Sequence, residues 1–254
     1  MRRLPLYLAS LLLLGACATS TAPPAARNIS APVASSPSNS VYVAPGALDL
    51  VTALPPPPAA GSPEERAELD QMLRIQQQRT PVQVERVRAD ATIAIWRFAD
   101  ALGNPAGFDA RHLPITGAFF EHLEREVSAD YETAKKTFAR PRPYRTEPRL
   151  APVVDKPGSP SYPSGHSTWA HTMAIVLADM VPERKPEIFA RAEEYGHNRT
   201  VAGVHYPSDV EAGKLSGTVI GAALLASPRF RSDEAAASAE LRRSLGLPPQ
   251  PALH

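Results

Sequence analysis

The chain has 254 residues, 43% of them hydrophobic and 21% charged, which is enough apolar material for one sizeable buried core. It carries 27 lysines and arginines against 26 aspartates and glutamates, a formal net charge of +1. This balance excludes a strongly basic surface, so we expect no nucleic-acid polymer as a partner.

The first residues are typical of an export signal. Two arginines precede an apolar run that reaches Leu14 and is too short to span a membrane. Cys17, the only cysteine of the chain, follows a Leu-Gly-Ala triplet that resembles a bacterial lipobox. We therefore expect a lipoprotein signal peptide over residues 1–16 and lipid attachment at Cys17. Ordinary signal cleavage after Ala18 remains an alternative, because the small residues around it also fit that pattern.

These signals predict a location. An alanine after the cysteine is compatible with sorting to an outer membrane, so we expect a periplasmic, outer-membrane-anchored lipoprotein. Contact with the membrane is then made only through the lipid on Cys17. Ordinary cleavage would instead give a soluble periplasmic or secreted protein.

A flexible tether is expected over residues 17–60. This stretch is rich in alanine, serine and proline and has few large apolar residues, so burial cannot offset the entropy of ordering it. Within it, residues Leu48 to Leu54 are expected to dock on the domain. The prolines at 55–58 predict a short, stiff polyproline segment.

The remaining residues, 61–254, are predicted to form one helical domain. Ser62 is an N-cap residue that proline and glutamate follow, which predicts a helix running towards Gln78. Apolar residues then recur at helical spacing from Val84 to Leu102. This spacing predicts a single second helix, which the following Gly-Asn pair ends.

Apolar periodicity predicts further helices in the second half of the chain, with a Pro- and Gly-rich loop over residues 140–163. No stretch alternates apolar and polar residues for long, so no strand is predicted. The expected fold is all-α, a compact helical bundle. The expected helices run from about Ala118 to Phe138, His166 to Met180, Pro186 to about Arg199, Pro207 to Ala226, and Ser232 to Leu245.

Three short clusters of cationic, hydroxyl, histidine and carboxylate residues lie in this half. Their spacing resembles that of the class A bacterial non-specific acid phosphatases, within the superfamily of type 2 phosphatidic-acid phosphatases and vanadium haloperoxidases. The similarity covers about residues 48–225 and includes the amino-acid sequence that flanks the clusters. The clusters are Lys135 with Arg142; Ser164, Gly165 and His166; and Arg199, His205 and Asp209.

The resemblance implies a bundle of the acid phosphatase/vanadium haloperoxidase type and a phosphatase domain over residues 61–254. It also implies an acid phosphatase that hydrolyses phosphomonoesters and releases inorganic phosphate, without a metal or cofactor. The natural substrate, the pH optimum and the oligomeric state do not follow from it.

The cationic residues suit phosphoryl transfer. Lys135, Arg142 and Arg199 would meet the negative charge that spreads over the phosphate oxygens, and arginine forks match those oxygens in pairs. Ser164 and Gly165 come just before a predicted helix. Their backbone N–H groups and the serine hydroxyl could therefore point at an anion at the positive end of the helix dipole.

The resemblance also assigns roles to the two histidines. His205 would be the nucleophile that forms a phosphohistidine, with Asp209 accepting the hydrogen of its other ring nitrogen. His166 would be the general acid for the leaving group and then the base that activates water. The sequence by itself shows two histidines and does not say which one attacks.

One position departs from the family pattern. The residue before Arg199 is usually serine in the family, and here it is Asn198. The asparagine amide can still donate a hydrogen bond to a phosphate oxygen, so we include Asn198 among the predicted phosphate-binding residues.

Two further histidines raise the alternative of a metal site. His171 lies about one turn after His166, and His197 precedes the third cluster. The family carries no catalytic metal, and the nearby lysine and arginines would repel a dication. We therefore expect no metal, and we expect Trp96 and Trp169 to be core or pocket-wall residues rather than ligands.

Three other functions remain open at this point. A lipid or lipid-diphosphate phosphatase could be held near the bilayer by the anchor at Cys17. A vanadate-dependent haloperoxidase could use the same residues, with His205 as the axial ligand of vanadate. A non-catalytic protein could retain only a phosphate pocket, although such a protein would need neither the two histidines nor Asp209.

Overall fold

The computed structural model describes residues 42–44 and 46–250. No strand occurs within these ranges, which confirms the expected all-α class. The helices are α1 Leu50–Ala53, α2 Pro63–Gln78, α3 Pro81–Ala89, η1 Ile95–Phe98, η2 Asp100–Leu102, α4 Pro114–Phe138, α5 Pro143–Thr146, α6 Gly165–Met180, η3 Pro182–Arg184, α7 Lys185–Val201, α8 Pro207–Ala226 and α9 Pro228–Ser244.

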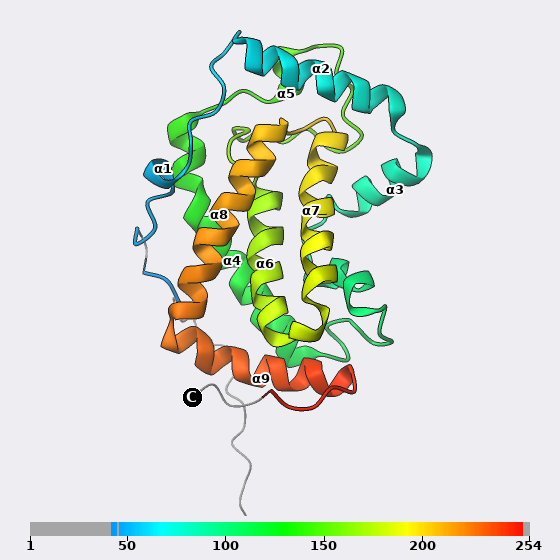
Figure 1. Cartoon of the computed structure of the whole chain (residues 1–254), viewed down its shortest axis with the longest axis vertical. Helices are drawn as coiled ribbons and strands as arrows, with labels where there is room; N and C mark the ends of the chain where they lie inside the picture. The colour runs from blue at the N-terminus through cyan, green and yellow to red at the C-terminus, as the bar shows by residue number, and fades with distance from the viewer. Residues whose placement is uncertain (1–41, 45, 251–254) are drawn as a thin grey trace, which may run out of the picture. The chain divides into compact units, whose positions relative to one another are not determined.

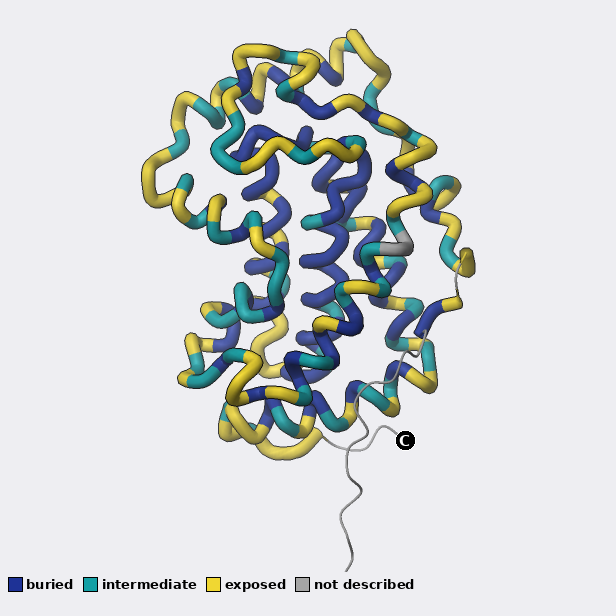
Figure 2. Tube along the Cα trace, turned by 180° about the vertical axis from the view of Figure 1, so that it is seen from behind, coloured by how far each residue is buried: buried dark blue, intermediate teal, exposed yellow. Residues whose placement is uncertain are grey.

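Helix α6 is the centre of the bundle. It lies between α7 and α8, with α4 behind it and α9 crossing below (Figure 1). Buried positions dominate these central helices, whereas exposed positions lie at the periphery (Figure 2). Leu177 and Met173 of α6 are fully buried, and burying such a side chain contributes about 1.5–3 kcal/mol. A helix that is apolar on nearly every side must be surrounded by others, which is why α6 takes the central place.

Glycines on α8 allow this helix to pack very closely against α6. A Cβ atom on Gly213 would lie 2.6 Å from the carbonyl oxygen of Ser164, and one on Gly217 would lie 2.5 Å from that of Thr168. Real side chains do not tolerate such distances, so larger residues would push the helices apart. The close packing brings the start of α8 beside the start of α6, where the backbone N–H of Ser164 donates to the carbonyl of Asp209 at 2.9 Å.

The single helix predicted from Val84 to Leu102 is wrong. Helix α3 ends at Ala89, and the chain resumes helical turns only in η1 and η2. The cause is Asp90, which is fully buried and accepts hydrogen bonds from side chains of α7. A buried carboxylate must be paired, and reaching its partners turns the backbone out of the helix. The predicted end at Gly103 is confirmed, with φ of 84°.

Other helix ends agree with local signals, except that α4 and α9 each begin four residues before the predicted start, α9 at Pro228 instead of Ser232. Ser62 caps α2 and accepts from the backbone N–H of Glu65 at 3.1 Å. Helix α4 begins at Pro114, before the predicted Ala118, because the carboxylate of Glu240 on α9 caps its first turn. That carboxylate accepts from the backbone N–H of Thr116 at 2.7 Å.

The segment before α2 packs on the helical domain. The backbone N–H groups of Tyr42 and Val43 both donate to Glu126 of α4, each at 2.7 Å. Leu50 and Leu54 are buried, in agreement with the docking expected for this stretch. The domain therefore extends N-terminal to the predicted boundary at residue 60. The predicted signal peptide and Cys17 lie outside the described residues.

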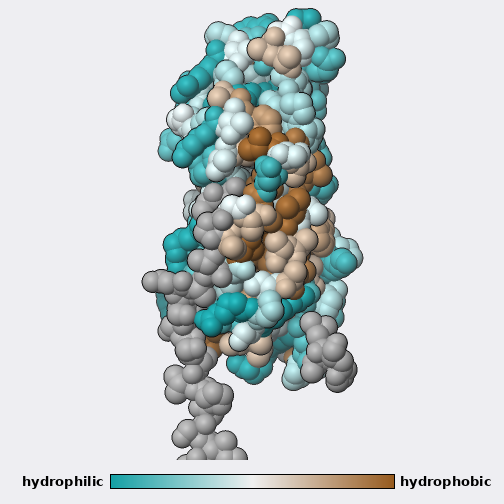
Figure 3. Space-filling model, turned by 90° about the vertical axis from the view of Figure 1, so that its left-hand side faces the viewer, coloured by the Kyte–Doolittle hydropathy of each residue, from teal (hydrophilic) through white to brown (hydrophobic). Residues whose placement is uncertain are grey.

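Two further features concern the distribution of apolar residues. Within the described ranges no helix combines the length and the apolar character needed to cross a bilayer. The side that carries α1 and α8 shows an apolar band in its middle (Figure 3). Leu215 of α8 is the large apolar residue of this helix that stands out, with 47% of its surface exposed.

Candidate active site

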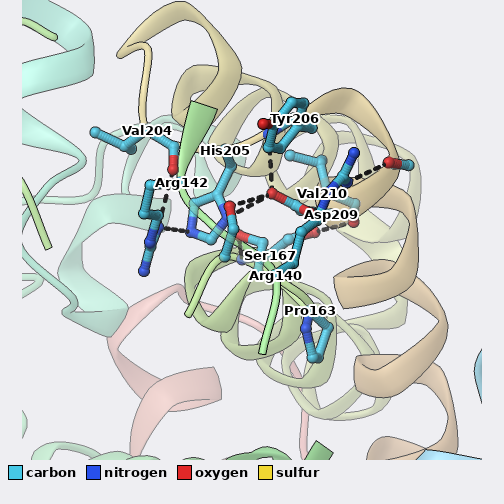
Figure 4. A network of polar contacts seen from close by, with 12 residues as sticks. Arg140, Arg142, Pro163, Ser167, Val204, His205, Tyr206, Asp209 and Val210 are labelled. Atoms are coloured by element: carbon cyan, nitrogen blue, oxygen red, sulfur yellow. Dashed lines mark hydrogen bonds and ion pairs between the residues drawn. The ribbon is translucent and has the colours of Figure 1, made fainter. Parts of the chain in front are cut away.

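His205 and Asp209 form a buried pair at the start of α8. The Nδ1 atom of His205 lies 3.3 Å from Oδ2 of Asp209, and its Nε2 lies 2.8 Å from Nη1 of Arg142 (Figure 4). A carboxylate accepts and a guanidinium donates, so Nδ1 carries the hydrogen and Nε2 carries the lone pair. Burial, reinforced by Arg142 and Lys135, holds the pKa of His205 well below its usual range. The ring is therefore neutral, with its lone pair directed towards the guanidinium of Arg142.

Asp209 is held by more donors than His205 alone. Its carboxylate also accepts from the backbone N–H of Tyr206 at 2.9 Å, from Arg140 at 2.7 Å and from the hydroxyl of Ser161. Burial raises the pKa of Asp209, whereas the charge of Arg140 and these hydrogen bonds lower it. Four donors, one of them the paired Arg140, favour the carboxylate form, which then orients the imidazole.

Arg140 and Ser161 were not predicted as site residues. Arg140 also pairs with Glu68 at 2.9 Å and donates to Ser208 at 2.7 Å, so it ties α2 to the start of α8. The available signals were weak: Arg140 lies two residues before Arg142, and Ser161 stands three residues before the second cluster. Their importance arises from contact with Asp209, which sequence spacing does not reveal.

His166 faces the same region from the first turn of α6. Its Nε2 lies 3.1 Å from the carbonyl oxygen of Ala91, and its ring stacks on Tyr195 with centroids 6.1 Å apart. Because a carbonyl only accepts, Nε2 carries the hydrogen and Nδ1 is the nitrogen left for other chemistry. Burial and the charge of Arg199 lower the pKa of His166 to about 3. In the ligand-free protein this histidine is therefore neutral.

Three buried cations surround these histidines. Lys135 donates to the carbonyls of Pro160 and Pro163 at 3.0 and 2.7 Å, and burial together with Arg142 lowers its pKa to about 8. Arg199 is 2% exposed, and its Nε and Nη1 have no hydrogen-bond partner in the described part of the chain. Burial lowers the pKa of Arg199 to about 10. Buried donors without acceptors are costly, so the arrangement is suited to an anion that enters the site.

The turn before α6 differs in part from the prediction. The backbone N–H of Ser164 donates to the carbonyl of Asp209, so the expectation that it points at an anion is wrong. The hydroxyl of Ser164 accepts from the backbone N–H of Ser167 at 3.4 Å and keeps its own hydrogen. Gly165 lets Tyr131 of α4 approach, since a Cβ there would lie 2.8 Å from the phenol oxygen. Its N–H remains in the unpaired first turn of the helix.

Asn198 is turned towards a protein partner. Its amide nitrogen donates to Oδ2 of Asp90 at 2.8 Å, and only 7% of the residue is exposed. Asp90 also accepts from Arg191 at 2.5 Å and from Arg97 at 3.2 Å. Asn198 therefore links α7 to the segment whose Ala91 carbonyl holds His166, and Asp90 is a further residue that the sequence analysis missed.

Metal ligands are not grouped in this structure. The described residues contain no set of three or more histidine, cysteine, aspartate or glutamate side chains placed to hold a metal ion. The Nδ1–H of His171 donates to the carbonyl of Ser167 at 2.9 Å, and its Nε2 lies 3.5 Å from Oε1 of Glu193. His197 lines a separate surface pocket with Glu193 and Glu211. Neither histidine is among the contacts of His205 and Asp209 described above.

Comparisons with known proteins give matches along most of the chain. A model of the PAP2 superfamily matches residues 125–233. The chain is 30% identical over 198 residues to a non-specific acid phosphatase of Salmonella typhi, covering 74% of this chain and 78% of that protein. It is 29% identical over 202 residues to an acid phosphatase of Zymomonas mobilis, covering 77% of this chain and 76% of the relative.

Other similarities cover less of the chain or have lower sequence identity. A decaprenylphosphoryl-5-phosphoribose phosphatase of Mycobacterium tuberculosis is 33% identical over 88 residues, which is 35% of this chain and 48% of that protein. Among solved structures, a bacterial vanadium-dependent iodoperoxidase superposes with a TM-score of 0.54 at 18% identity. The match covers 71% of this chain and about half, 54%, of the iodoperoxidase chain, and it shows a shared fold.

Proposed function

The chain belongs to the PAP2 superfamily, in the group of the non-specific acid phosphatases, and from this premise we propose how it works as a phosphoric monoester hydrolase. The proposal is a covalent phosphohistidine formed on His205, with no metal. The observation that carries it is the buried guanidinium of Arg199, whose Nε and Nη1 have no hydrogen-bond partner among the described residues, in a site that also holds the His205–Asp209 pair. An anion-binding group and an oriented nucleophile are the two requirements of this chemistry.

In the first half-reaction, Nε2 of His205 attacks phosphorus while the bond from phosphorus to the leaving oxygen breaks. The leaving oxygen takes the electron pair of that bond and a proton from Nδ1 of His166. Asp209 accepts the Nδ1–H of His205 and stabilises the positive charge that the ring acquires. Arg142, which contacts Nε2 in the ligand-free protein, moves its hydrogen bond to a phosphate oxygen.

In the second half-reaction, water attacks the phosphohistidine and gives its proton to Nδ1 of His166. The bond between phosphorus and Nε2 of His205 then breaks, and inorganic phosphate leaves. Lys135, Arg142 and Arg199 stabilise the phosphate oxygens throughout, together with the hydroxyl of Ser164 and the N–H of Gly165. We assign Asn198 to the support of this site through Asp90.

The test uses p-nitrophenyl phosphate in the presence of a chelator. We expect turnover that resists the chelator and is lost in His205→Ala. After mixing with labelled p-nitrophenyl phosphate, whose nitrophenolate can leave without a proton, and rapid quenching in alkali, His166→Ala should retain label on the protein, because dephosphorylation still needs its base. Turnover that survives in His205→Ala would exclude this nucleophile.

The two alternative enzymatic functions predict different results with the same purified proteins. With hydrogen peroxide supplied as the oxidant, a vanadate-dependent haloperoxidase would oxidise halide only after vanadate is added. A lipid phosphatase would hydrolyse phosphatidic acid in mixed micelles far better than p-nitrophenyl phosphate. Phosphate binding without turnover would indicate a protein that only retains the pocket.

The location remains a proposal as well. The lipobox-like text before Cys17 supports a lipoprotein signal peptide over residues 1–16, export to the periplasm and a tether up to the described segment at residue 42. Labelling of expressing cells with a radioactive fatty acid should mark the wild-type protein and not Cys17→Ala. Labelling of neither protein would favour ordinary signal cleavage, and equal labelling of both would exclude Cys17 as the lipidated residue.

A further inference from the structure

The phenol of Tyr131 on α4 lies against the first residue of α6. A Cβ atom on Gly165 would lie 2.8 Å from the phenol oxygen and 2.9 Å from Cζ, so the phenol occupies the space that any other residue here would fill. The backbone nitrogen of Gly165 is one bond, about 1.5 Å, from the Cα that the phenol faces. Since the N–H of Gly165 belongs to the proposed phosphate site, the phenol oxygen lies at the edge of that site.

The ring of Tyr131 contacts a second residue of the site. Lys135 follows Tyr131 by four residues on α4, so the two side chains lie on the same face of that helix. The Nζ atom of Lys135 lies 5.7 Å from the centre of the Tyr131 ring, within the range of a cation–π interaction. Tyr131 therefore contacts one proposed phosphate-binding residue with the face of its ring and another with the phenol at its tip.

The phenol of Tyr131 has a hydrogen that no protein acceptor takes up. Within the described ranges it makes the ring contact to Lys135 and no hydrogen bond. Burial, followed by the charges of Glu132 and Glu124, raises the pKa of Tyr131 to about 12, so the phenol stays protonated and can donate. The other described tyrosines all donate their phenol hydrogen to a protein acceptor: Tyr42, Tyr144, Tyr162, Tyr195 and Tyr206.

The surroundings of this phenol favour an anion as its acceptor. Lys135 is a cation, Arg142 is close enough to lower the pKa of Lys135, and the start of α6 is the positive end of a helix dipole. A phosphate that binds the N–H of Gly165 brings oxygen atoms, which are strong acceptors, to the place that the phenol faces. The phenol is neutral, so it supplies a hydrogen bond there without adding to the repulsion among the cations.

We propose that Tyr131 is a further phosphate-binding residue, whose phenol donates a hydrogen bond to an oxygen of the bound phosphate beside the N–H of Gly165. Its ring at the same time holds the ammonium group of Lys135. The inference rests on the proposed function, in which this site binds the phosphate of the substrate. Tyr131 lies outside the three sequence clusters, one helical turn before the first of them, so their spacing does not include it.

The experiment removes the hydroxyl alone. Tyr131→Phe keeps an aromatic face for Lys135, and calorimetry measures the Kd for inorganic phosphate. We expect this Kd to rise about tenfold, which corresponds to about 1.4 kcal/mol and is typical of one hydrogen bond to a charged group. The matched control is Tyr42→Phe, which removes a phenol that donates to Asp233 at 3.2 Å and should leave the Kd unchanged. An unchanged Kd in Tyr131→Phe would overturn the proposal.

Turnover separates the phosphate from the organic group. In Tyr131→Phe, kcat/KM should fall by the same factor for p-nitrophenyl phosphate and for glycerol 2-phosphate, because these substrates share only the phosphate. A fall for one of them alone would place the phenol at the organic group and overturn the proposal.

A second variant separates the hydroxyl from the ring. Tyr131→Leu loses both, so it should weaken phosphate binding more than Tyr131→Phe does. Weaker binding in Tyr131→Leu with wild-type binding in Tyr131→Phe would leave a role for the ring only, against the proposed hydrogen bond. If the wild-type protein binds phosphate and hydrolyses neither ester, the proposed function fails, while the phosphate titrations still decide the role of Tyr131.

Discussion

Binding of phosphate is expected to bring a proton onto His166. In the ligand-free protein, burial and Arg199 lower the pKa of His166 to about 3, so the ring is neutral at pH 5. As a general acid it must be protonated when substrate is bound. Its pKa must therefore rise from about 3 to at least 5, which corresponds to about 3 kcal/mol at 1.4 kcal/mol for each pH unit.

A bound phosphate can supply this free energy. A single negative charge about 4 Å from the imidazolium contributes about 4 kcal/mol at the effective dielectric constant of a partly buried site. The same charge compensates Arg199, Arg142 and Lys135, which are the cations that lower the pKa of His166. The two effects have the same sign, so protonation in the complex is favoured.

Calorimetry measures the proton directly. Titration of the protein with inorganic phosphate at pH 5, in two buffers of different ionisation enthalpy, should show uptake of about one proton for each phosphate bound. His166→Asn is the matched control, because it keeps a polar side chain that does not titrate, and it should bind phosphate without this uptake. A heat of binding that is independent of the buffer, or uptake that persists in His166→Asn, would refute the reasoning.

Three other predictions follow from the same geometry. Asp209→Asn should lower kcat by roughly 10³–10⁴-fold in steady-state assays, because the amide favours the wrong tautomer of His205; a loss below tenfold would contradict this role. The melting temperature of the ligand-free protein should fall more steeply from pH 7 to pH 4 than that of His166→Asn. Folding lowers the pKa of His166, so the neutral ring contributes stability above the unfolded-state pKa of about 6.5, and this contribution is lost as the pH falls towards 3. The same pH dependence of the melting temperature in both proteins would contradict the prediction. Gly217→Ala should lower the free energy of unfolding, measured in urea, by about 1–3 kcal/mol, because the new Cβ would meet the backbone of α6. The control is Gly158→Ala, which should change the free energy of unfolding little because a Cβ there has open space. Equal effects of the two substitutions would argue against close packing of α6 and α8.

Local signals predicted most of the helices, because caps and apolar spacing act within a few residues. Helix α8 begins at Pro207 and ends at Ala226, as its sequence indicates. The break after α3 could not be found in this way. Asp90 interrupts the helix because it meets Arg191 and Asn198, which lie 101 and 108 positions further along the chain.

The same distinction holds for the site. The three clusters could be identified because their residues stand close together in the sequence, and the structure brings His205, Asp209 and Arg142 into contact. Arg140 escaped notice because its partner Asp209 is 69 positions away. The hydrogen bond from the Ser164 N–H to the carbonyl of Asp209 likewise depends on how closely α8 approaches α6. The spacing of glycines in the sequence does not give that distance.

The attachment of residues 42–60 to the domain also has a mechanical consequence. A pulling force applied N-terminal to Tyr42 loads the hydrogen bonds to Glu126 first, and then the buried side chains of Leu50 in α1 and of Leu54 directly after it. Only after these contacts break does tension reach Pro55, whose carbonyl accepts from the phenol of Tyr162 in the loop over residues 140–163. These contacts act in series, so the segment would detach in steps. The loop over residues 140–163 is thereby protected from tension on the N-terminal end of the chain.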